Sequence, residues 1–522
     1  MVAALAAGVR GAEPGWDVVV YSGVPCGLAA AVTAARGGAR VLLIEPTRHV
    51  GGLSTSGINT AETEHMLTWT IGGFADEFYR RMGRHYGSGK PEYYFESSVA
   101  EACYLELLAE AGVTVQYGQR VEKVAKDGAA LTTLTLSDGS TVAGKVFVDA
   151  SYEGDVMARA GVDYAVGREA RATYDEEAAG VRFDQTVRRA ATTDAAGQLL
   201  PGISDWARNL TEGDAHRAVM NYNFRLTVAK DPALKVPIPA PDHYDRRRFA
   251  LLEGWLRGKT ARAEEVKLDH ILDLYGRRNG KFELNNKQSA IFSLGHFGGQ
   301  FDWPDADWPK REAIYQDHLD YTLGLLYFLA NDEAVPEPVR AEMRQWGLHR
   351  GEFADNGNLP YQLYVREARR MKGVQVVTQH DAQTDRHKAD SIGFSSHFID
   401  CHHVQRLALS PSEFINEGRI WRMGYAYQIP YAALTPKPEQ AANLLVPGAA
   451  SFSHVAFCSY RLESVWMIAG HAAGVAAAMA AKADGKVTAV DVEQLQAKLR
   501  EQKQVVDFVP GELEKCPHLN GP

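Results

Sequence analysis

The sequence predicts an α/β fold that opens with a βαβ unit, and three consecutive segments support this prediction. Residues 17–20 (DVVV) form a short apolar run of β-branched side chains, which is typical of a buried parallel strand. Residues 24–39 (VPCGLAAAVTAARGGA) predict a helix, with a proline in its first turn and two glycines near its end. Residues 40–45 (RVLLIE) predict a second buried strand, which completes the unit.

The turn between the first strand and the helix is a degenerate dinucleotide-binding fingerprint. Aligned on GxGxxG, the three glycine positions fall on Ser22, Val24 and Gly27. Gly27 keeps the position at which helix and strand pack closely, and Gly23 gives the turn conformational freedom. Glu45 follows Gly27 by 18 residues, where a carboxylate accepts hydrogen bonds from a ribose. Taken alone, the turn fits a phosphate site and an ordinary βαβ connection equally well.

A glycine-rich loop directly after this acidic residue favours the cofactor interpretation. In residues 48–57 (RHVGGLSTSG), Gly51 and Gly52 would let the backbone approach a second part of a long cofactor. The hydroxyls of Ser54 and Thr55 would be available as donors. The alternative interpretation is a flexible loop.

Composition narrows the class of partner and cofactor. The chain of 522 residues has a formal net charge of −9, which argues against nucleic acid as the main partner. No CxxC pair occurs, so neither a structural zinc site nor a dithiol redox motif is expected, and no metal site is predicted. Isolated buried thiols are the simplest interpretation of the five cysteines, namely Cys26, Cys103, Cys401, Cys458 and Cys516.

Hydropathy predicts no membrane span, because no apolar run reaches the roughly 20 residues that a bilayer requires. The start of the chain is apolar and rich in small residues but lacks a basic n-region. A frayed tail is the simpler interpretation, and a trimmed export signal at residues 1–12 is the alternative. Localisation therefore stays open between cytoplasm and periplasm, and an oligomer is possible.

Five stretches together resemble a known family. The chain is similar to the bacterial FAD-dependent oxidoreductases, which have a glutathione-reductase-like FAD domain and are distantly similar to the succinate dehydrogenase and fumarate reductase flavoproteins. The matching stretches are residues 18–57, 146–169 (VFVDASYEGDVMARAGVDYAVGRE), 359–371 (LPYQLYVREARRM), 428–436 (QIPYAALTP) and 443–480.

The resemblance implies FAD as cofactor and assigns contacts to it. The turn at residues 22–27, Pro25 included, would line the pyrophosphate, and Glu45 would hold the adenosine ribose. The loop after residue 48 would approach the diphosphate and the flavin. The remaining implied contacts are the Val121 backbone with adenine, Ala150 near the cofactor, Gly448 near the ribityl chain, and Gly470 and Gly474 on a helix face that admits a planar ring.

The resemblance also implies a domain organisation of the GR2 type. The Rossmann-like FAD-binding domain would comprise residues 15–155 and 425–500, separated by an inserted α+β substrate or cap domain at 156–424. Residues 501–522 would form a C-terminal tail. Within the insert, residues 220–228 and 289–297 predict strands, and residues 307–332 predict an amphipathic helix.

No second βαβ fingerprint for a nicotinamide follows the first. We therefore expect direct oxidation or reduction of a small-molecule substrate, with electrons exchanged with O₂, a quinone or a carrier. Three hypotheses are open. They are oxidation of a secondary alcohol of a sugar, glycoside or cyclitol, C–C dehydrogenation or C=C reduction beside a carboxylate, and a non-catalytic FAD-binding protein.

Flavin chemistry on an alcohol or a C–C bond needs a proton acceptor and donors that hold an oxygen. Residues 451–464 precede the helix expected near the flavin, so His454 is predicted as acid/base and Arg461 as an anion or carbonyl clamp. Tyr364 and Arg366 are candidates from the insert. His402 and His403 are adjacent on a strand, so only one can reach the site, and His403 is the candidate.

Overall fold

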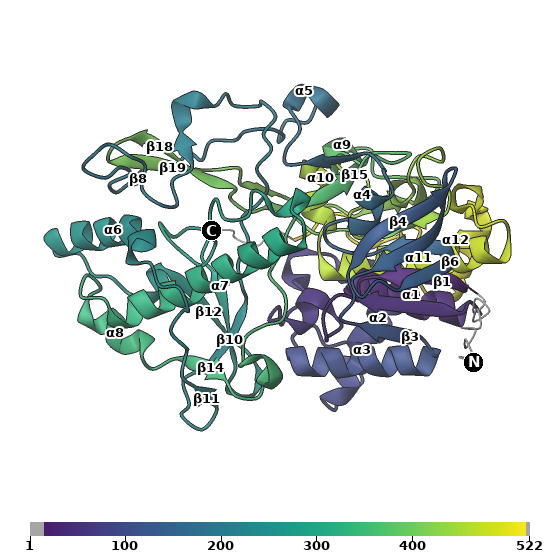
Figure 1. Ribbon diagram of the computed structural model, residues 1–522, viewed down its shortest axis with the longest axis horizontal. Helices are drawn as coiled ribbons and strands as arrows, with labels where there is room; N and C mark the ends of the chain where they lie inside the picture. Colours follow the sequence, from purple (N-terminus) through teal and green to yellow (C-terminus); the bar gives the residue numbers. More distant parts are fainter. Residues whose placement is uncertain (1–14, 518–522) are drawn as a thin grey trace, which may run out of the picture.

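A mixed sheet built from distant parts of the chain lies on the right of Figure 1. The computed structural model describes residues 15–517. The order is β3-β2-β1-β6-β5-β4, and β22 also pairs with β6; β1, β2, β3, β6 and β22 are parallel, whereas β4, β5 and β6 form an antiparallel meander. The bounds are β1 Trp16–Tyr21, β2 Val41–Glu45, β3 Thr114–Tyr117, β4 Val121–Asp127, β5 Ala130–Leu136, β6 Thr141–Asp149 and β22 Leu444–Leu445.

Two alanine-rich helices pack against each other beside this sheet, α1 (Pro25–Arg36) and α11 (Glu463–Lys482). Their small side chains allow a close approach, because a Cβ added to Gly470 would lie only 2.1 Å from the carbonyl oxygen of Cys26. Helices α2 (Gly73–His85) and α3 (Ser97–Ala111) pack around them. The βαβ unit and the parallel sheet confirm the predicted Rossmann-like fold class.

The left of Figure 1 holds a five-stranded sheet with helices beside it. Its order is β11-β14-β10-β13-β12. The bounds are β10 Leu226–Ala229, β11 Lys235–Val236, β12 Leu272–Gly276, β13 Phe282–Asn286, β14 Gly347–His349, α6 Ala250–Ala261, α7 Trp308–Asn331 and α8 Glu337–Met343. The predicted long helix is α7. The exact domain boundaries stay a prediction.

Two predicted strands of this region differ from the structure. Of residues 220–228, only the last three belong to a strand, β10. Residues 289–297 form no strand but make one isolated bridge, between Tyr222 and His296. The apolar side chains of this segment pack into the core instead, where the ring of Phe292 lies 6.0 Å from that of Phe249. An apolar run fits a buried irregular segment as well as a buried strand.

Short strands and helices connect the two halves and complete the top of Figure 1. A four-stranded sheet has the order β8-β19-β18-β9, and the pairs are β7 with β15, β16 with β21 and β17 with β20. The bounds are β7 Tyr164–Val166, β8 Arg188–Arg189, β9 Asp205–Trp206, β15 Arg369–Met371, β16 Ser391–Ser395, β17 Ile399–Cys401, β18 Gln405–Ser410, β19 Glu413–Glu417, β20 Ile420–Arg422, β21 Tyr427–Pro430, α4 Asp155–Arg159, α5 Arg171–Tyr174, α9 Gln379–Gln383, α10 His454–Tyr460 and α12 Val492–Glu501.

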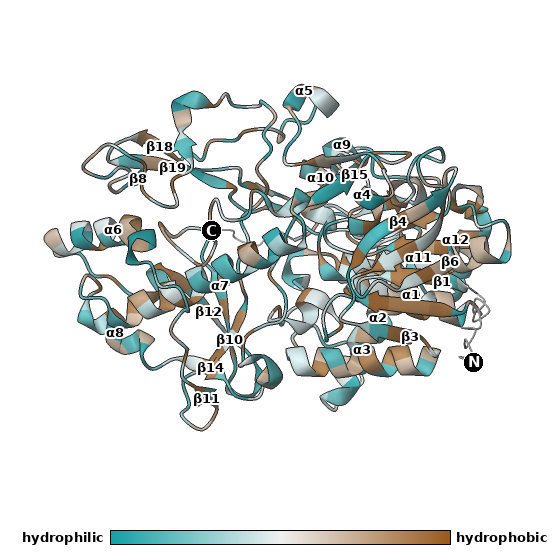
Figure 2. Ribbon diagram, viewed as in Figure 1, coloured by the Kyte–Doolittle hydropathy of each residue, from teal (hydrophilic) through white to brown (hydrophobic). Residues whose placement is uncertain are grey.

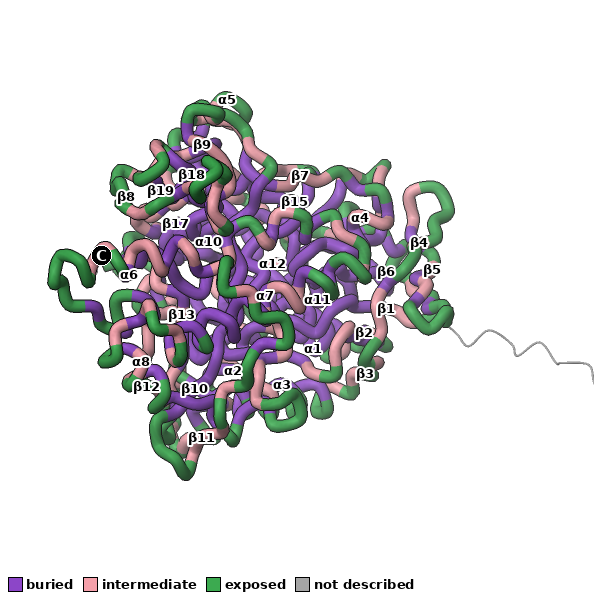
Figure 3. Tube along the Cα trace, turned by 60° about the vertical axis from the view of Figure 1, so that its left-hand side comes forward, coloured by how far each residue is buried: buried purple, intermediate pink, exposed green. Residues whose placement is uncertain are grey.

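The hydrophobic core is densest around α1, α11 and the sheet beside them (Figure 2), and this interior is almost entirely buried (Figure 3). Among residues 15–517, α11 is the single helix long and apolar enough to cross a bilayer. Within the structure, 94% of its apolar window is buried, as in a core helix. The proposed export signal at residues 1–12 lies outside the described residues.

Candidate active site

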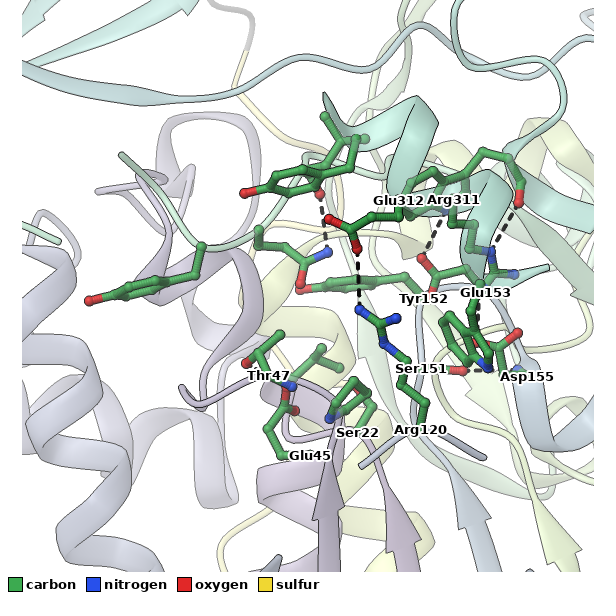
Figure 4. A pocket seen from close by; sticks show the side chains of 18 of the residues that line it. Ser22, Glu45, Thr47, Arg120, Ser151, Tyr152, Glu153, Asp155, Arg311 and Glu312 are labelled. Atoms are coloured by element: carbon green, nitrogen blue, oxygen red, sulfur yellow. Dashed lines mark hydrogen bonds and ion pairs between the residues drawn. The ribbon is translucent and has the colours of Figure 1, made fainter. Parts of the chain in front are cut away.

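The first cavity lies where β1 and β2 end, and Figure 4 looks into it. Its volume is about 360 Å³. Strand ends and the turn after β1 form one side, and helix α7 with Arg311 and Glu312 forms the other. The residues that line the first cavity include Ser22, Val24, Glu45, Thr47, Arg120, Ser151, Tyr152 and Glu153.

The turn at residues 22–27 has the geometry of a phosphate-binding turn despite its missing glycines. A Cβ added to Gly27 would lie 1.9 Å from the carbonyl oxygen of Ser22, so only glycine fits this position. Ser22 itself takes the left-handed conformation, with φ of 76°. Val24 has φ of −74° and ψ of 170°, which any residue adopts, so the backbone does not require glycine there. Both Ser22 and Val24 line the first cavity.

Glu45 ties the turn to the strand end and keeps one acceptor position free. Its Oε2 accepts from the Gly23 N–H at 2.6 Å, and its Oε1 accepts from the Thr47 N–H and hydroxyl, both at 2.7 Å. Burial raises the pKa of this carboxyl above its usual value. An ionised carboxylate offers about four lone-pair positions, so three are occupied and one remains for a ligand hydroxyl.

The glycine-rich loop packs directly against this turn. The Gly51 N–H donates to the carbonyl oxygen of Gly23 at 2.7 Å. A Cβ added to Gly52 would lie 2.4 Å from the Tyr152 hydroxyl oxygen, and φ is 52° there. Gly52 and Thr55 line a small recess beside the first cavity, whereas Ser54 is buried. The buried hydroxyl of Ser56 in the same recess has no hydrogen-bond partner among the described residues.

Tyr152 is a wall residue that sequence analysis missed. Its hydroxyl accepts from the Leu53 N–H at 3.1 Å and donates to Glu463 Oε1 at 3.3 Å. It therefore links the glycine-rich loop to the first turn of α11. Burial raises the pKa of Glu463 well above its usual value, which favours the protonated carboxyl. A tyrosine two residues after a predicted strand carries no local pattern that would have distinguished it.

Three residues predicted to contact the cofactor, Val121, Ala150 and Gly448, do not line the first cavity, and their contacts with FAD stay a prediction. The Val121 N–H donates to the Tyr21 hydroxyl at 3.4 Å, and its carbonyl oxygen accepts from the Trp308 indole at 3.3 Å. Its neighbour Arg120 lines the cavity instead. Ala150 is fully buried, and a Cβ added to Gly448 would lie 2.6 Å from the Ala150 carbonyl oxygen. Residues 151–153 form the wall in their place.

Gly470 and Gly474 lie in a close contact between helices, and the cofactor contact predicted for them stays a prediction. A Cβ added to Gly474 would lie 2.2 Å from the carbonyl oxygen of Ala30, so both glycines face the backbone of α1. They allow two helices to approach each other and do not line a described cavity.

The second cavity is larger, about 520 Å³, and much more polar. Its walls come from the segment after the glycine-rich loop, from strands β12 and β13, and from the segments around β17 and β20. The polar residues that line the second cavity include Glu62, His65, Arg225, Asp273, Arg277, Glu283, Asn286, Lys287, Asp400, His402 and Arg419.

The charges of the second cavity are mostly paired with each other. Burial alone would raise the pKa of Glu62, but the hydrogen bond and charge of His397 and the charge of Arg225 outweigh it and lower this pKa to about 2. The other pairs are Arg225 with Glu283, Arg277 with Glu283 at 2.9 Å, Lys287 with Asp273 at 2.7 Å and Arg461 with Asp400 at 3.2 Å. Within residues 15–517, Arg419 is the cavity arginine with no ion pair, and its guanidinium lies 5.8 Å from the centre of the Trp421 ring.

Arg461, Tyr364 and Arg366 do not line the second cavity but contact residues that do, and their predicted catalytic roles stay a prediction. Arg461 donates to the Asp400 carbonyl oxygen at 2.7 Å and to the Tyr364 hydroxyl at 3.1 Å. Its carboxylate partner is thus Asp400 rather than the neighbouring Glu463. Arg366 donates to Asn286 Oδ1 at 3.0 Å, and burial lowers its pKa to about 9.

The two adjacent histidines have different surroundings, and the catalytic role predicted for His403 stays a prediction. Only one lines the second cavity, as strand alternation requires, and it is His402. Its Nε2 lies 3.5 Å from Asp400 Oδ2, and its buried Nδ1 has no hydrogen-bond partner among the described residues. Burial, together with the charge of Arg366, lowers its pKa to about 3. His403 points elsewhere, with its Nε2 3.5 Å from Asp184.

His454 lines neither cavity, and its role as acid/base stays a prediction. It is buried at the start of α10, with Nδ1 2.7 Å from Glu367 Oε1 and Nε2 3.2 Å from Cys401 Sγ. Burial alone would lower its pKa, but the charges of Glu367 and Cys401 outweigh it and raise this pKa to about 10.

The first cavity fits an FAD cofactor. Only glycine fits at position 27, so the start of α1 can pack closely against the backbone of Ser22, as in dinucleotide-binding folds. Glu45 retains one acceptor position, and the unpaired Ser56 hydroxyl lies in the adjoining recess. Ser22, Val24, Gly52 and Thr55 would border the cofactor, and their contacts with FAD stay a prediction.

A model of the family "FAD dependent oxidoreductase" matches residues 17–499. No curated protein matches the chain. Similar solved structures include Thermovibrio ammonificans THI4 (22% identity, 30% of this chain, 66% of that chain, TM-score 0.23) and glycine oxidase from Geobacillus kaustophilus (16%, 30%, 63%, 0.23). L-proline dehydrogenase from P. horikoshii is similar over 35% of this chain and 63% of that chain, at 12% identity and a TM-score of 0.25. This chain thus covers less than two thirds of each. The family match spans nearly the whole sequence, and the chain therefore belongs to the FAD-dependent oxidoreductases.

Proposed function

We propose that this flavoenzyme oxidises a secondary alcohol of a neutral polyhydroxylated molecule, such as a sugar, glycoside or cyclitol, bound in the second cavity. One observation carries this proposal: the cavity offers many donors and acceptors whose charges are already paired within the protein. Such a wall can bind hydroxyl groups without demanding a charged ligand. Tyr94, Tyr275 and Trp421 add aromatic surface beside these groups, which suits a sugar ring.

One short segment supports the placement of the substrate next to the cofactor. Tyr361, Gln362 and Leu363 line the first cavity. The next residue, Tyr364, accepts a hydrogen bond from Arg461, which holds Asp400 of the second cavity. Tyr364 and Arg461 thus link the segment that lines the first cavity to Asp400 of the second, and a cofactor that extends along the first cavity would reach toward the second.

When bound, FAD supplies the acceptor for the hydride that leaves the alcohol carbon. His402 would take the hydroxyl proton at Nδ1, because its lowered pKa keeps the imidazole neutral and this nitrogen has no other partner. Asp400, held by Arg461, would stabilise the imidazolium that forms. The amide of Asn286, fixed by Arg366, would orient a substrate hydroxyl.

The test is reduction of the bound flavin under anaerobic conditions by a panel of neutral polyols and of small carboxylic acids. We expect bleaching at about 450 nm by one or more polyols and none by the acids. His402→Gln should lower kcat by about 100-fold, the low end for a lost general base, since a lowered pKa makes it a weak base. His403→Gln is the matched control, because that side chain faces away. Equal losses in both variants would contradict this assignment.

Oxidation or reduction beside a carboxylate is the second candidate, and Arg419 favours it. This arginine has no ion pair among the described residues and could bind a carboxylate bidentately. Bleaching by acids alone, abolished in Arg419→Ala, would support this candidate over the first. Reoxidation with O₂, a quinone or a protein carrier in the same cuvette would then identify the class of electron acceptor.

A further inference from the structure

Two cysteines and one histidine from two distant segments converge in the core outside both cavities. The Cys401 and Cys458 sulfurs and a ring nitrogen of His454 all lie within 4.8 Å of one another, and all three residues are buried. His454 Nε2 lies 3.2 Å from Cys401 Sγ. Apolar side chains, among them Met220 and Ile399, pack around the two cysteines.

The secondary structure presents these three side chains in a chelating arrangement. His454 and Cys458 are four residues apart on α10 and therefore lie on one face of the helix. The Cys458 thiol donates to the His454 carbonyl oxygen at 3.2 Å, which fixes its position. Cys401 ends strand β17, whose alternation turns it away from the second cavity, where Asp400 and His402 point.

A carboxylate orients the histidine as carboxylates do in metal sites. Glu367 Oε1 lies 2.7 Å from His454 Nδ1 and would keep that nitrogen as an N–H donor, so Nε2, which lies 3.2 Å from Cys401 Sγ, is the nitrogen that would bind a metal after it releases its proton. Arg370 forms ion pairs with Glu367 and Glu169. The carboxylate is therefore held in place by a third residue and cannot swing freely.

We propose that Cys401 Sγ, Cys458 Sγ and His454 Nε2 bind a thiophilic metal ion, either Zn²⁺ or Cu⁺. Both metals take thiolate and imidazole ligands. Binding converts the two thiols into thiolates and releases their protons. Two thiolates would neutralise Zn²⁺, so a zinc-loaded cluster would add no net charge to this apolar surrounding. Three protein ligands leave one position of a tetrahedral zinc site for a water or complete a trigonal Cu⁺ site.

The test starts from the full-length protein, purified with its FAD under reducing conditions without chelators. Elemental analysis should find about one zinc or copper per chain, and the X-ray absorption edge identifies which. For zinc, the fine structure should show sulfur at about 2.3 Å and nitrogen at about 2.0 Å. A protein that stays free of both metals, even after Zn²⁺ or Cu⁺ is added under reducing conditions, would overturn the proposal. So would oxygen-only coordination, or a Cys401–Cys458 disulfide in the protein as isolated.

Substitutions of cysteines test whether the metal binds at this cluster. Cys458→Ser should reduce the bound metal from about one per chain to nearly none, whereas Cys103→Ser, at a buried cysteine on α3, should leave it unchanged. Metal retained at full occupancy in Cys458→Ser would also overturn the proposal. If that variant does not fold, the absorption spectrum of the unmodified protein decides alone. Flavin absorbance, followed in parallel, separates this result from the proposed alcohol oxidation.

Discussion

The two cavities are built in different ways. One side of the first is made by the backbone of a local motif, in which Gly27, Glu45 and the loop after residue 48 lie within a short stretch of sequence, and helix α7 closes the other side. The second is made by charged side chains from segments hundreds of residues apart, such as Glu62, Arg225 and Asp400. The difference teaches that a cofactor site can be encoded locally while the neighbouring polar site depends on long-range packing, and each should respond to different mutations.

The largest expected effect is the loss of a buried charge partner in the second cavity. Arg225→Ala would leave Glu283 buried with only Arg277, so the free energy of unfolding should fall by about 3–5 kcal/mol. Urea denaturation measures this change. Arg189→Ala is the control, because its ion pair with Glu413 is exposed and should contribute about 1 kcal/mol or less. Similar losses in the two variants would show that burial does not distinguish the second cavity from the surface.

The second-largest effect is expected from a substitution that disrupts the local motif of the first cavity. In Gly27→Ala, the new methyl group would meet the Ser22 carbonyl oxygen at 1.9 Å, so the turn must move. We expect a loss of about 3 kcal/mol in stability, the upper end for overpacking, and a fall in bound FAD per chain. Gly254→Ala on α6 is the control, since its nearest contact would be at 4.0 Å. Full FAD occupancy in Gly27→Ala would contradict the role given to this turn.

Protonation of His402 in the second cavity should have an effect of intermediate size on the free energy of unfolding. The pKa of His402 is lowered to about 3, from about 6.5 in the unfolded chain. Between these values only the unfolded chain is protonated here, so acid favours unfolding. This side chain alone should reduce the free energy of unfolding by about 2 kcal/mol between pH 7 and pH 5.

His402→Gln should remove that part of the pH dependence in urea denaturation at the two pH values. His85→Gln is the control at an exposed histidine and should leave the slope of the parent protein. An unchanged slope in His402→Gln would mean that His402 takes up its proton over the same pH range in the folded and unfolded states, so that its pKa is not lowered by folding.

Local features of the molecule could be predicted from the sequence, whereas contacts between distant segments could not. The βαβ unit, Gly27 and Glu45 were predictable because helix period, strand composition and a fixed spacing are local properties. Arg225 and Glu283 were not, because their pairing depends on the antiparallel contact of β10 with β13. Strand alternation showed that one of two adjacent histidines would reach the site but not which one. His454 lies close in sequence to α11, the helix expected near the flavin, but at the start of α10 its side chain points into the core.

The smallest expected effect tests whether the degenerate fingerprint has a functional cost. Val24 occupies the second glycine position, but its negative φ needs no glycine, and its side chain borders the first cavity beside Gly52. Val24→Gly would restore the fingerprint but remove a buried apolar side chain. This loss should lower the free energy of unfolding by about 2 kcal/mol. The effect on the cofactor should be small, with a change in the Kd for FAD of about fivefold or less. Fluorescence titration of the apoprotein with FAD measures this. A gain of 100-fold in affinity would mean that valine narrows the approach to the pyrophosphate after all, and that this local motif is a compromise between packing and cofactor binding.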